Sequence, residues 1–244
     1  NSNHGYQIPE QLDWLDSILN MTILDTNIDF VFAQLHHPHH SELWCPGNTS
    51  FTGDVIELLE NYTENSGKPS IHFYGHTHGY SRGESKDHEH LMINVATAGG
   101  AIDYWGEWPQ KDYEEYSFSQ DEWGYVLVEV DAGNDPKFKL KRISMGDSKV
   151  SKYNTLEDSI LIRLHNISPQ KPIGIFPTYV DSVNVNSIVF ISTPFIDDDA
   201  DKHGGTQWQI NDNCSDFTNP IIDKWIQHQN VYRNVKTDNS SSLT

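Results

Sequence analysis

The stretch that decides the fold is SIHFYGHTHGYSR, which runs from Ser70 to Arg82. It begins with a short apolar run that ends at Gly75, a pattern typical of a buried strand followed by a turn. The turn places His76 and His78 just beyond the end of the strand. Open α/β sheets bind their ligands at this edge, and neutral imidazoles are good ligands for zinc, iron or manganese. The stretch therefore predicts a metal site at the edge of a sheet.

A second histidine cluster follows an earlier predicted strand. Residues Asp29 to Leu35 read as a strand, and the sequence His36-His37-Pro38-His39-His40 comes directly after it. A helix from about Thr52 to Tyr62 separates the two strands. Because a right-handed crossover makes such strands parallel, we expect both histidine clusters at the same edge of the sheet.

Three of these histidines are candidate metal ligands. His36 closes its strand, and Pro38 cannot continue a ladder, so the chain must turn where the His36 side chain faces the edge. His76 and His78 alternate along the chain, and the glycines on either side of them permit a turn that brings both rings together. The alternative is that these are solvated polar residues of two loops.

His37 and His39 are candidate catalytic residues. The pKa of a histidine suits the donation of a proton to a leaving group, and either ring could also support the ligands. Simple exposure in a histidine-rich surface loop would explain the same two residues.

The remaining pattern predicts an α/β or α+β fold. An amphipathic helix is expected from Pro9 to Leu19, and a strand from Leu91 to Ala96. A hairpin of two strands, Tyr125 to Val130 and Lys137 to Ile143, is expected around a Gly-Asn-Asp-Pro turn.

Composition shifts divide the chain. Residues 1–145 carry the mixed pattern of strands and helices, and residues 146–170 are polar and broken by glycine and proline, so we expect a linker there. Residues 171–244 contain strand candidates at Asp181 to Thr193 and Thr206 to Ile210. These are too few to close a β-sandwich, so an incomplete sandwich module is expected.

The formal net charge of −19 restricts the partners. No basic stripe exists to neutralise phosphates, so nucleic-acid binding is not expected. A phosphate-ester substrate would need a metal to supply local positive charge. No apolar stretch approaches the length of a membrane span.

Two other features could bind or cross-link. Cys45 and Cys214 have no metal-site spacing, so they are two free thiols or one disulfide. The acidic run from Asp197 to Asp201 could hold calcium, although a solvated turn explains it more simply.

Several motifs together resemble a known family. The stretch from Gln11 to Leu15, then His36-His37-Pro38, then the turn from Gly75 to Arg82 is similar to the C-terminal half of calcineurin-like metallophosphoesterases. The nearest match is to purple-acid-phosphatase-like members, which share a GHxHxYxR turn. Ser81 stands where those members often carry glutamate, and Gly79 where they often carry alanine.

The resemblance covers about residues 7–143 and implies a specific chemistry. It implies the C-terminal half of a four-layer αββα sandwich that hydrolyses phosphate esters at two metal ions (iron, zinc or manganese). His36 and His76 would bind one ion and His78 the other. The candidate substrate-binding residues that the same resemblance implies are Tyr80, Arg82, Asn94, Gly99 and Gly100.

The region from Lys171 onward is similar to fibronectin type III-like modules, which follow secreted bacterial phosphoesterases. This similarity implies an extracellular or periplasmic protein.

The family's carboxylate ligands belong to motifs that precede the Gln11 helix, and this sequence contains none of them. Three neutral histidines cannot replace that negative charge between two cations. We therefore expect the isolated chain to be a C-terminal fragment without a competent dinuclear centre. Two other interpretations stay open: a non-catalytic binding or adhesion module on a degenerate scaffold, and a mononuclear zinc site built from three histidines.

Overall fold

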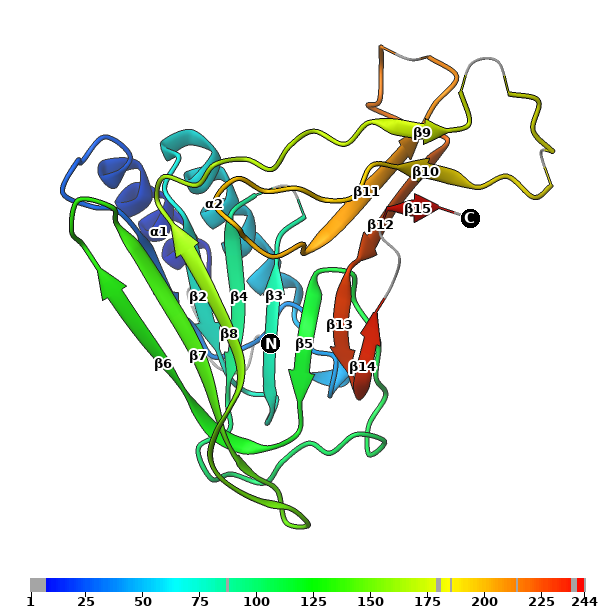
Figure 1. The fold of residues 1–244 in the computed structure, drawn as a ribbon. Helices are drawn as coiled ribbons and strands as arrows, with labels where there is room; N and C mark the ends of the chain where they lie inside the picture. Colours follow the sequence, from blue (N-terminus) through cyan, green and yellow to red (C-terminus); the bar gives the residue numbers. More distant parts are fainter. Residues whose placement is uncertain are drawn as a thin grey trace. The chain divides into compact units, whose positions relative to one another are not determined.

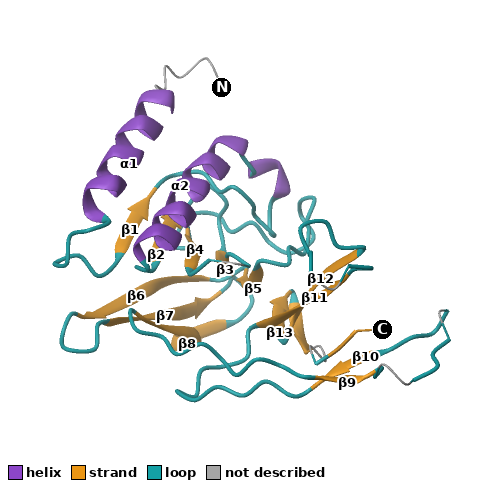
Figure 2. Cartoon of the chain, turned by 90° about the horizontal axis from the view of Figure 1, so that it is seen from above, coloured by secondary structure: helices purple, strands orange, loops and turns teal. Residues whose placement is uncertain are grey.

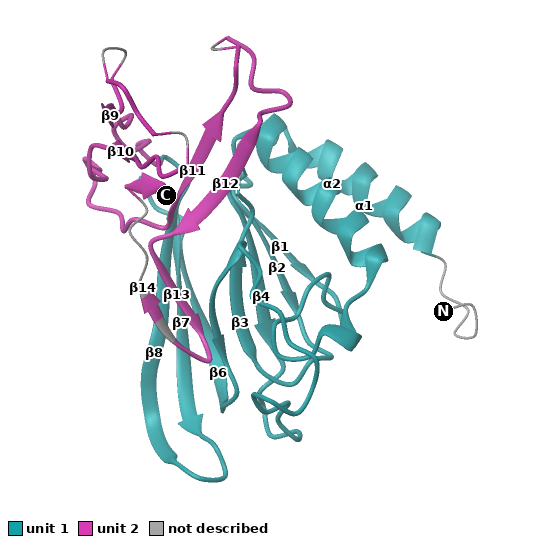
Figure 3. Cartoon of the chain, turned by 90° about the vertical axis from the view of Figure 1, so that its right-hand side faces the viewer, with its two compact units in different colours: residues 1–165 teal, residues 166–244 magenta. Residues whose placement is uncertain are grey.

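The structure, a computed structural model, describes residues 8–86, 88–178, 181–184, 186–213, 215–237 and 241–243. The chain forms two compact units, Asn1–His165 and Asn166–Thr244 (Figure 3). Each unit is described by itself below. Among the described residues, no helix has both the length and the apolar character that a membrane crossing requires.

A mixed sheet forms the centre of the first unit (Figure 1). The strand order is β1-β2-β4-β3-β5, in which β1, β2 and β4 run parallel and β3 is antiparallel to both its neighbours. The strands are β1 (Val31–Gln34), β2 (Ser70–Tyr74), β3 (Tyr80–Glu84), β4 (His90–Val95) and β5 (Tyr116–Gln120). The parallel pairing of β1 with β2 confirms the crossover that the sequence predicts.

Two helices cover one face of this sheet (Figure 2). They are α1 (Ile8–Thr22) and α2 (Ser50–Ser66), and a short 3₁₀ turn, η2 (Cys45–Gly47), precedes α2. The buried cluster that joins the helices to the edge of the sheet contains Leu19 of α1 and Leu59 of α2. Both predicted helices are confirmed, with ends a few residues beyond the expected ones.

The start of α2 differs from the prediction in one informative way. Thr49, rather than Thr52, occupies the N-cap position. Thr52 lies inside the first turn, fully buried, and its Oγ1 donates a hydrogen bond to the backbone oxygen of His37 at 3.0 Å. The hydroxyl that resembled a cap therefore fastens the first histidine loop to the helix.

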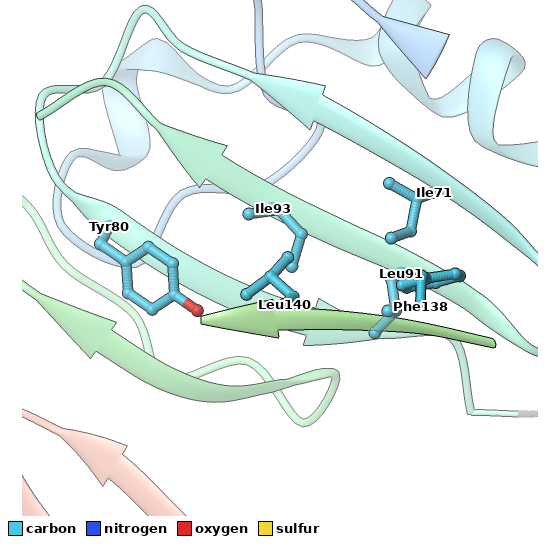
Figure 4. Close-up of a cluster of buried hydrophobic side chains, with 6 residues drawn as sticks. All are labelled: Ile71, Tyr80, Leu91, Ile93, Phe138 and Leu140. Carbon is cyan, nitrogen blue, oxygen red and sulfur yellow. The ribbon is translucent and has the colours of Figure 1, made fainter. Parts of the chain in front are cut away.

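A three-stranded antiparallel sheet covers the other face. It contains β6 (Trp123–Asp131), β7 (Lys137–Gly146) and β8 (Ser151–Arg163), and its first two strands are the predicted hairpin. The two sheets meet at a core of buried side chains, shown in Figure 4. These side chains are Ile71, Tyr80, Leu91, Ile93, Phe138 and Leu140. Helices, mixed sheet and antiparallel sheet give the three layers of a mixed α+β fold, as expected.

The prediction of a linker over residues 146–170 is wrong for Ser151–Arg163, because these residues form the strand β8. The strand looked unstructured because its first half is largely exposed and polar, with Asn154 in a left-handed conformation (φ 47°). Register shifts in its pairing with β7 further interrupt the alternation of polar and apolar residues. The boundary between the two units lies between His165 and Asn166, within the range predicted for the linker.

The second unit consists of short strands without a helix among its described residues. A three-stranded sheet has the order β15-β10-β9, and β11 with β12 and β13 with β14 form antiparallel pairs. Thr206 to Ile210 form a strand as predicted, whereas in the described part of Asp181 to Thr193 only β10 is a strand. The bounds are β9 (Gly174–Phe176), β10 (Phe190–Ser192), β11 (Gly205–Ile210), β12 (Ile222–Gln227), β13 (Gln229–Tyr232), β14 (Asn234–Thr237) and β15 (Ser242–Leu243).

Candidate metal centre

Three histidine rings meet at the carboxyl end of β1 and β2. Backbone hydrogen bonds join the two chain segments beyond the strands: the amide of Leu35 donates to the oxygen of Phe73 at 3.0 Å, and the amide of Gly75 donates to the oxygen of His36 at 3.1 Å. This pairing brings Nε2 of His36 within 3.2 Å of Nδ1 of His76. The ring of His37 lies 4.4 Å from that of His76, centroid to centroid. One ring nitrogen from each of the three histidines lies within 4.8 Å of the others.

The backbone of His76 is unusual. Its φ is +67°, in the left-handed region that residues other than glycine adopt uncommonly, although asparagine, aspartate and histidine do so more often than the rest. Partial burial lowers the pKa of this imidazole, and the neighbouring His36 and His78 lower it further, against an opposing effect of Asp103. A lowered pKa favours the neutral ring, which is the form that binds a metal.

His78 lies outside this group of three and is held by Asp103. The backbone amide of His78 donates to Oδ2 of Asp103 at 2.7 Å, and the amide of Asp103 donates back to the His78 oxygen at 2.9 Å. A Cβ on Gly100 would lie 3.7 Å from the His78 ring, so the Gly99–Gly100 loop passes close to it. Asp103 was missing from the predicted site because nothing in the sequence links it to His78, 25 residues earlier.

Asn94 shapes the turn between the histidines. Its side chain is fully buried, and Nδ2 donates to both the backbone oxygen and Oγ1 of Thr77 at 2.8 Å. The prediction that Asn94 contacts substrate is therefore replaced by a structural role: it fixes the residue that separates His76 from His78.

Tyr80 and Arg82 do not lie at the histidine site, contrary to the expectation that they bind substrate. Both side chains bond to Asp158 of β8: the Tyr80 hydroxyl donates at 2.8 Å, and Arg82 donates through Nε at 2.6 Å and Nη2 at 3.2 Å. The pKa of Tyr80 is raised well above its usual value, mainly by burial. These residues join the two sheets instead, because alternate side chains of β3 face the antiparallel sheet.

His39 is also separated from the three-ring group. Its Nδ1 donates to the backbone oxygen of Thr49 at 3.1 Å, next to the start of α2. Its ring contacts His40, which stacks on Tyr113 at 4.3 Å between centroids. Burial lowers the pKa of His40 to about 4. Of the two histidines predicted as catalytic, only His37 belongs to the group.

Aromatic side chains border the histidine rings on two sides. The centroid of Phe51 lies 5.5 Å from that of His37, and the centroid of Trp44 lies 5.2 Å from that of His76. Trp108 lies next to Trp44, with 5.9 Å between the ring centroids, and is 46% exposed. Among the residues that the structure describes, none bonds to the buried Nε1 of Trp44.

The residues present fit one metal ion better than two. Three imidazole nitrogens at this spacing are a sufficient protein set for a zinc site that keeps one position open. No carboxylate of the described residues belongs to the group, so the negative charge that two cations require is not supplied there.

Two further predicted features lie elsewhere. Cys45 carries a free thiol, and Cys214 lies outside the described residues. In the second unit, carboxylates of Asp197, Asp199 and Asp201 gather within 4.8 Å. Oδ1 of Asp197 accepts the amides of the other two at 3.0 Å, which is the hydrogen bonding of a tight turn. Calcium binding there stays a prediction.

Comparisons with known proteins give distant similarities. No family model matches the chain, and no curated protein matches it. Among solved structures, the chain is similar to GAP50, described as the anchor in the inner membrane complex of Plasmodium, with 16% identity and a TM-score of 0.44 over 65% of this chain and 46% of that one. It is weakly similar to PhoD, with 13% identity and a TM-score of 0.43 over 63% of this chain and 33% of that one. The chain thus spans less than half the length of either.

Proposed function

We propose that the protein is a metal-dependent phosphoesterase whose metal is held by His36, His37 and His76. One observation carries the proposal: three histidine rings from two segments far apart in the sequence lie with one nitrogen each within 4.8 Å of the others. The motifs around these rings, which resemble those of metallophosphoesterases, favour phosphate esters as the substrate.

The proposed roles differ from the expected ones at two residues. His37, expected as a proton donor, is assigned to the metal because its ring lies with those of His36 and His76. His78 stands beside the group, fixed by Asp103, and would serve a second metal only together with carboxylates from outside the group.

A bound metal would supply Lewis-acid activation at the phosphoryl group. Hydrolysis breaks the bond between phosphorus and the leaving oxygen and forms one between phosphorus and a water oxygen, giving phosphate and an alcohol. With a net charge of −19, the protein offers a phosphate little long-range attraction, so the site needs the local charge of a metal.

Zinc titration of metal-free protein tests the site. We expect one equivalent to bind in the wild type, and His36→Ala or His76→Ala to lose at least about tenfold in affinity, the usual effect of disturbing a metal-ligand set. His165→Ala removes an exposed histidine of the same unit and is the matched control. Two tightly bound equivalents would contradict the assignment of a single group.

Assays with an aryl phosphate and an aryl phosphodiester test the chemistry. Zinc-dependent turnover that His76→Ala abolishes and His165→Ala preserves would support the phosphoesterase. Stoichiometric zinc binding without turnover of either ester would contradict the phosphoesterase and support a mononuclear zinc site without catalysis.

A further inference from the structure

We infer that the histidine site takes phosphate esters whose leaving group is aromatic, with the ring stacked on Trp108. This inference rests on the proposed function and narrows its substrate class. It follows from the indoles that extend outward from the metal ligands.

The indole of Trp44 lies beside a proposed metal ligand, His76. The rings of Trp44 and His76 are 5.2 Å apart, so an aromatic surface begins one ring away from a proposed metal ligand. The backbone of Gly47 packs closely against Trp44, because a Cβ on Gly47 would lie only 2.8 Å from the indole ring. The indole is therefore a fixed wall of the site.

A second indole, that of Trp108, extends this aromatic surface into solvent. Trp108 lies 5.9 Å from Trp44, tilted by 52°, and 46% of its surface is open to solvent. Large apolar side chains this exposed commonly stand alone on a protein surface. Trp108 instead adjoins a second indole and, through it, a proposed metal ligand, so its exposed area belongs to an aromatic surface that begins at the histidine site. We assign this surface to the group attached to a bound phosphoryl.

The acidic protein attracts a phosphate poorly at long range, so contacts with the rest of the ester would add to the affinity that the metal supplies. Aromatic rings stacked on indole supply such affinity without any charge. An aryl or nucleobase group fits this requirement, whereas a small alkyl group would leave the indole uncovered.

Calorimetric titration with two non-hydrolysable phosphonates tests the inference without turnover. Phenylphosphonate and methylphosphonate carry the same anionic group, so the ratio of their affinities for the zinc-loaded protein isolates the ring. We expect phenylphosphonate to bind about tenfold more tightly, the range of a base–aromatic stacking contact. Trp108→Ala should reduce the ratio to near one, and Trp108→Phe should keep most of it.

Trp14→Ala is the matched control, because Trp14 is an even more exposed tryptophan, on α1. An unchanged ratio in Trp108→Ala, or equal affinity of both phosphonates in the wild type, would overturn the aromatic preference while zinc-dependent phosphonate binding upholds the metal site. Binding of phenylphosphonate without any dependence on zinc would uphold the aromatic surface and count against the phosphoesterase. Binding of neither ligand would overturn both.

Discussion

Acidification should destabilise the protein through two buried histidines, His72 of β2 and His90 of β4. Both are at most 1% exposed, and they form a hydrogen-bonded chain: Ser70 Oγ to His90 Nδ1 at 2.7 Å, then His90 Nε2 to His72 Nδ1 at 2.9 Å. The second bond needs one donor and one acceptor, so two protonated rings would place two N–H groups against each other. The other ring nitrogen of His72, Nε2, is buried and has no hydrogen-bond partner among the described residues.

Burial lowers the pKa of both rings. For His90 it falls from 6.5 to about 3, with a smaller contribution from His88, and for His72 it falls well below 6.5, with contributions from His90 and His39. Because the folded-state values lie below the unfolded ones, the unfolded chain binds more protons in between. The stability that the neutral rings of His72 and His90 contribute is therefore fully present above pH 6.5, and it is lost as the pH falls toward their folded-state pKa values.

The size of the loss follows from the pH interval. Between pH 6.5 and 4.5, a histidine that stays neutral in the folded state costs about 2.5 kcal/mol, so two such rings cost on the order of 5 kcal/mol. That is comparable to the whole free energy of unfolding of many domains, ~5–15 kcal/mol. Urea unfolding at several pH values between 4.5 and 7 measures it.

Substitution separates this effect from the titration of the many carboxylates. In His90→Gln, the free energy of unfolding should fall with pH less steeply than in the wild type, by about 1.4 kcal/mol per pH unit below pH 6. His165→Gln, which removes a histidine from solvent rather than from the core, should keep the wild-type slope. Equal slopes in the wild type and His90→Gln would refute the reasoning.

Three other outcomes are expected from thermal or urea unfolding. Asp158→Ala leaves the largely buried Arg82 without its partner and should cost about 3 kcal/mol or more, whereas Glu129→Ala, which breaks an exposed pair, should change the stability far less. Gly146→Ala should cost at least about 2 kcal/mol, because φ is +82° and the new Cβ would lie 1.9 Å from a backbone oxygen. Asn94→Ala should cost about 2 kcal/mol and also weaken zinc binding in the titration, since the turn loses two hydrogen bonds; unchanged zinc affinity would limit Asn94 to folding.

The parts of the fold that the sequence predicts well are those with strong local signals. The run from Ser70 to Tyr74 is bounded by Pro69 and Gly75, and the strand has those bounds in the structure. The meeting of His36 and His76 followed from the expectation that their strands are parallel, which the pairing of β1 with β2 confirms.

The features that the sequence missed depend on distant pairing. Nothing near Ser151 indicates a strand, because β8 is specified by its pairing with β7 and by Asp158, which binds two residues of β3. Nothing in the sequence around Asp103 indicates its role either, because that role depends on the chain returning to His78 in the folded protein. Tyr80 and Arg82 were misplaced because a motif gives the residue types but not the face of the strand.

The left-handed backbone of His76 sets stability against function at a single residue. Such a conformation costs a residue with a Cβ roughly 1–2 kcal/mol, which glycine does not incur. His76→Gly should therefore be more stable than His76→Ala and comparable to, or above, the wild type, while it removes the ring. The backbone at this position thus favours glycine, and the imidazole that occupies it carries a conformational cost that its proposed role as a metal ligand would offset.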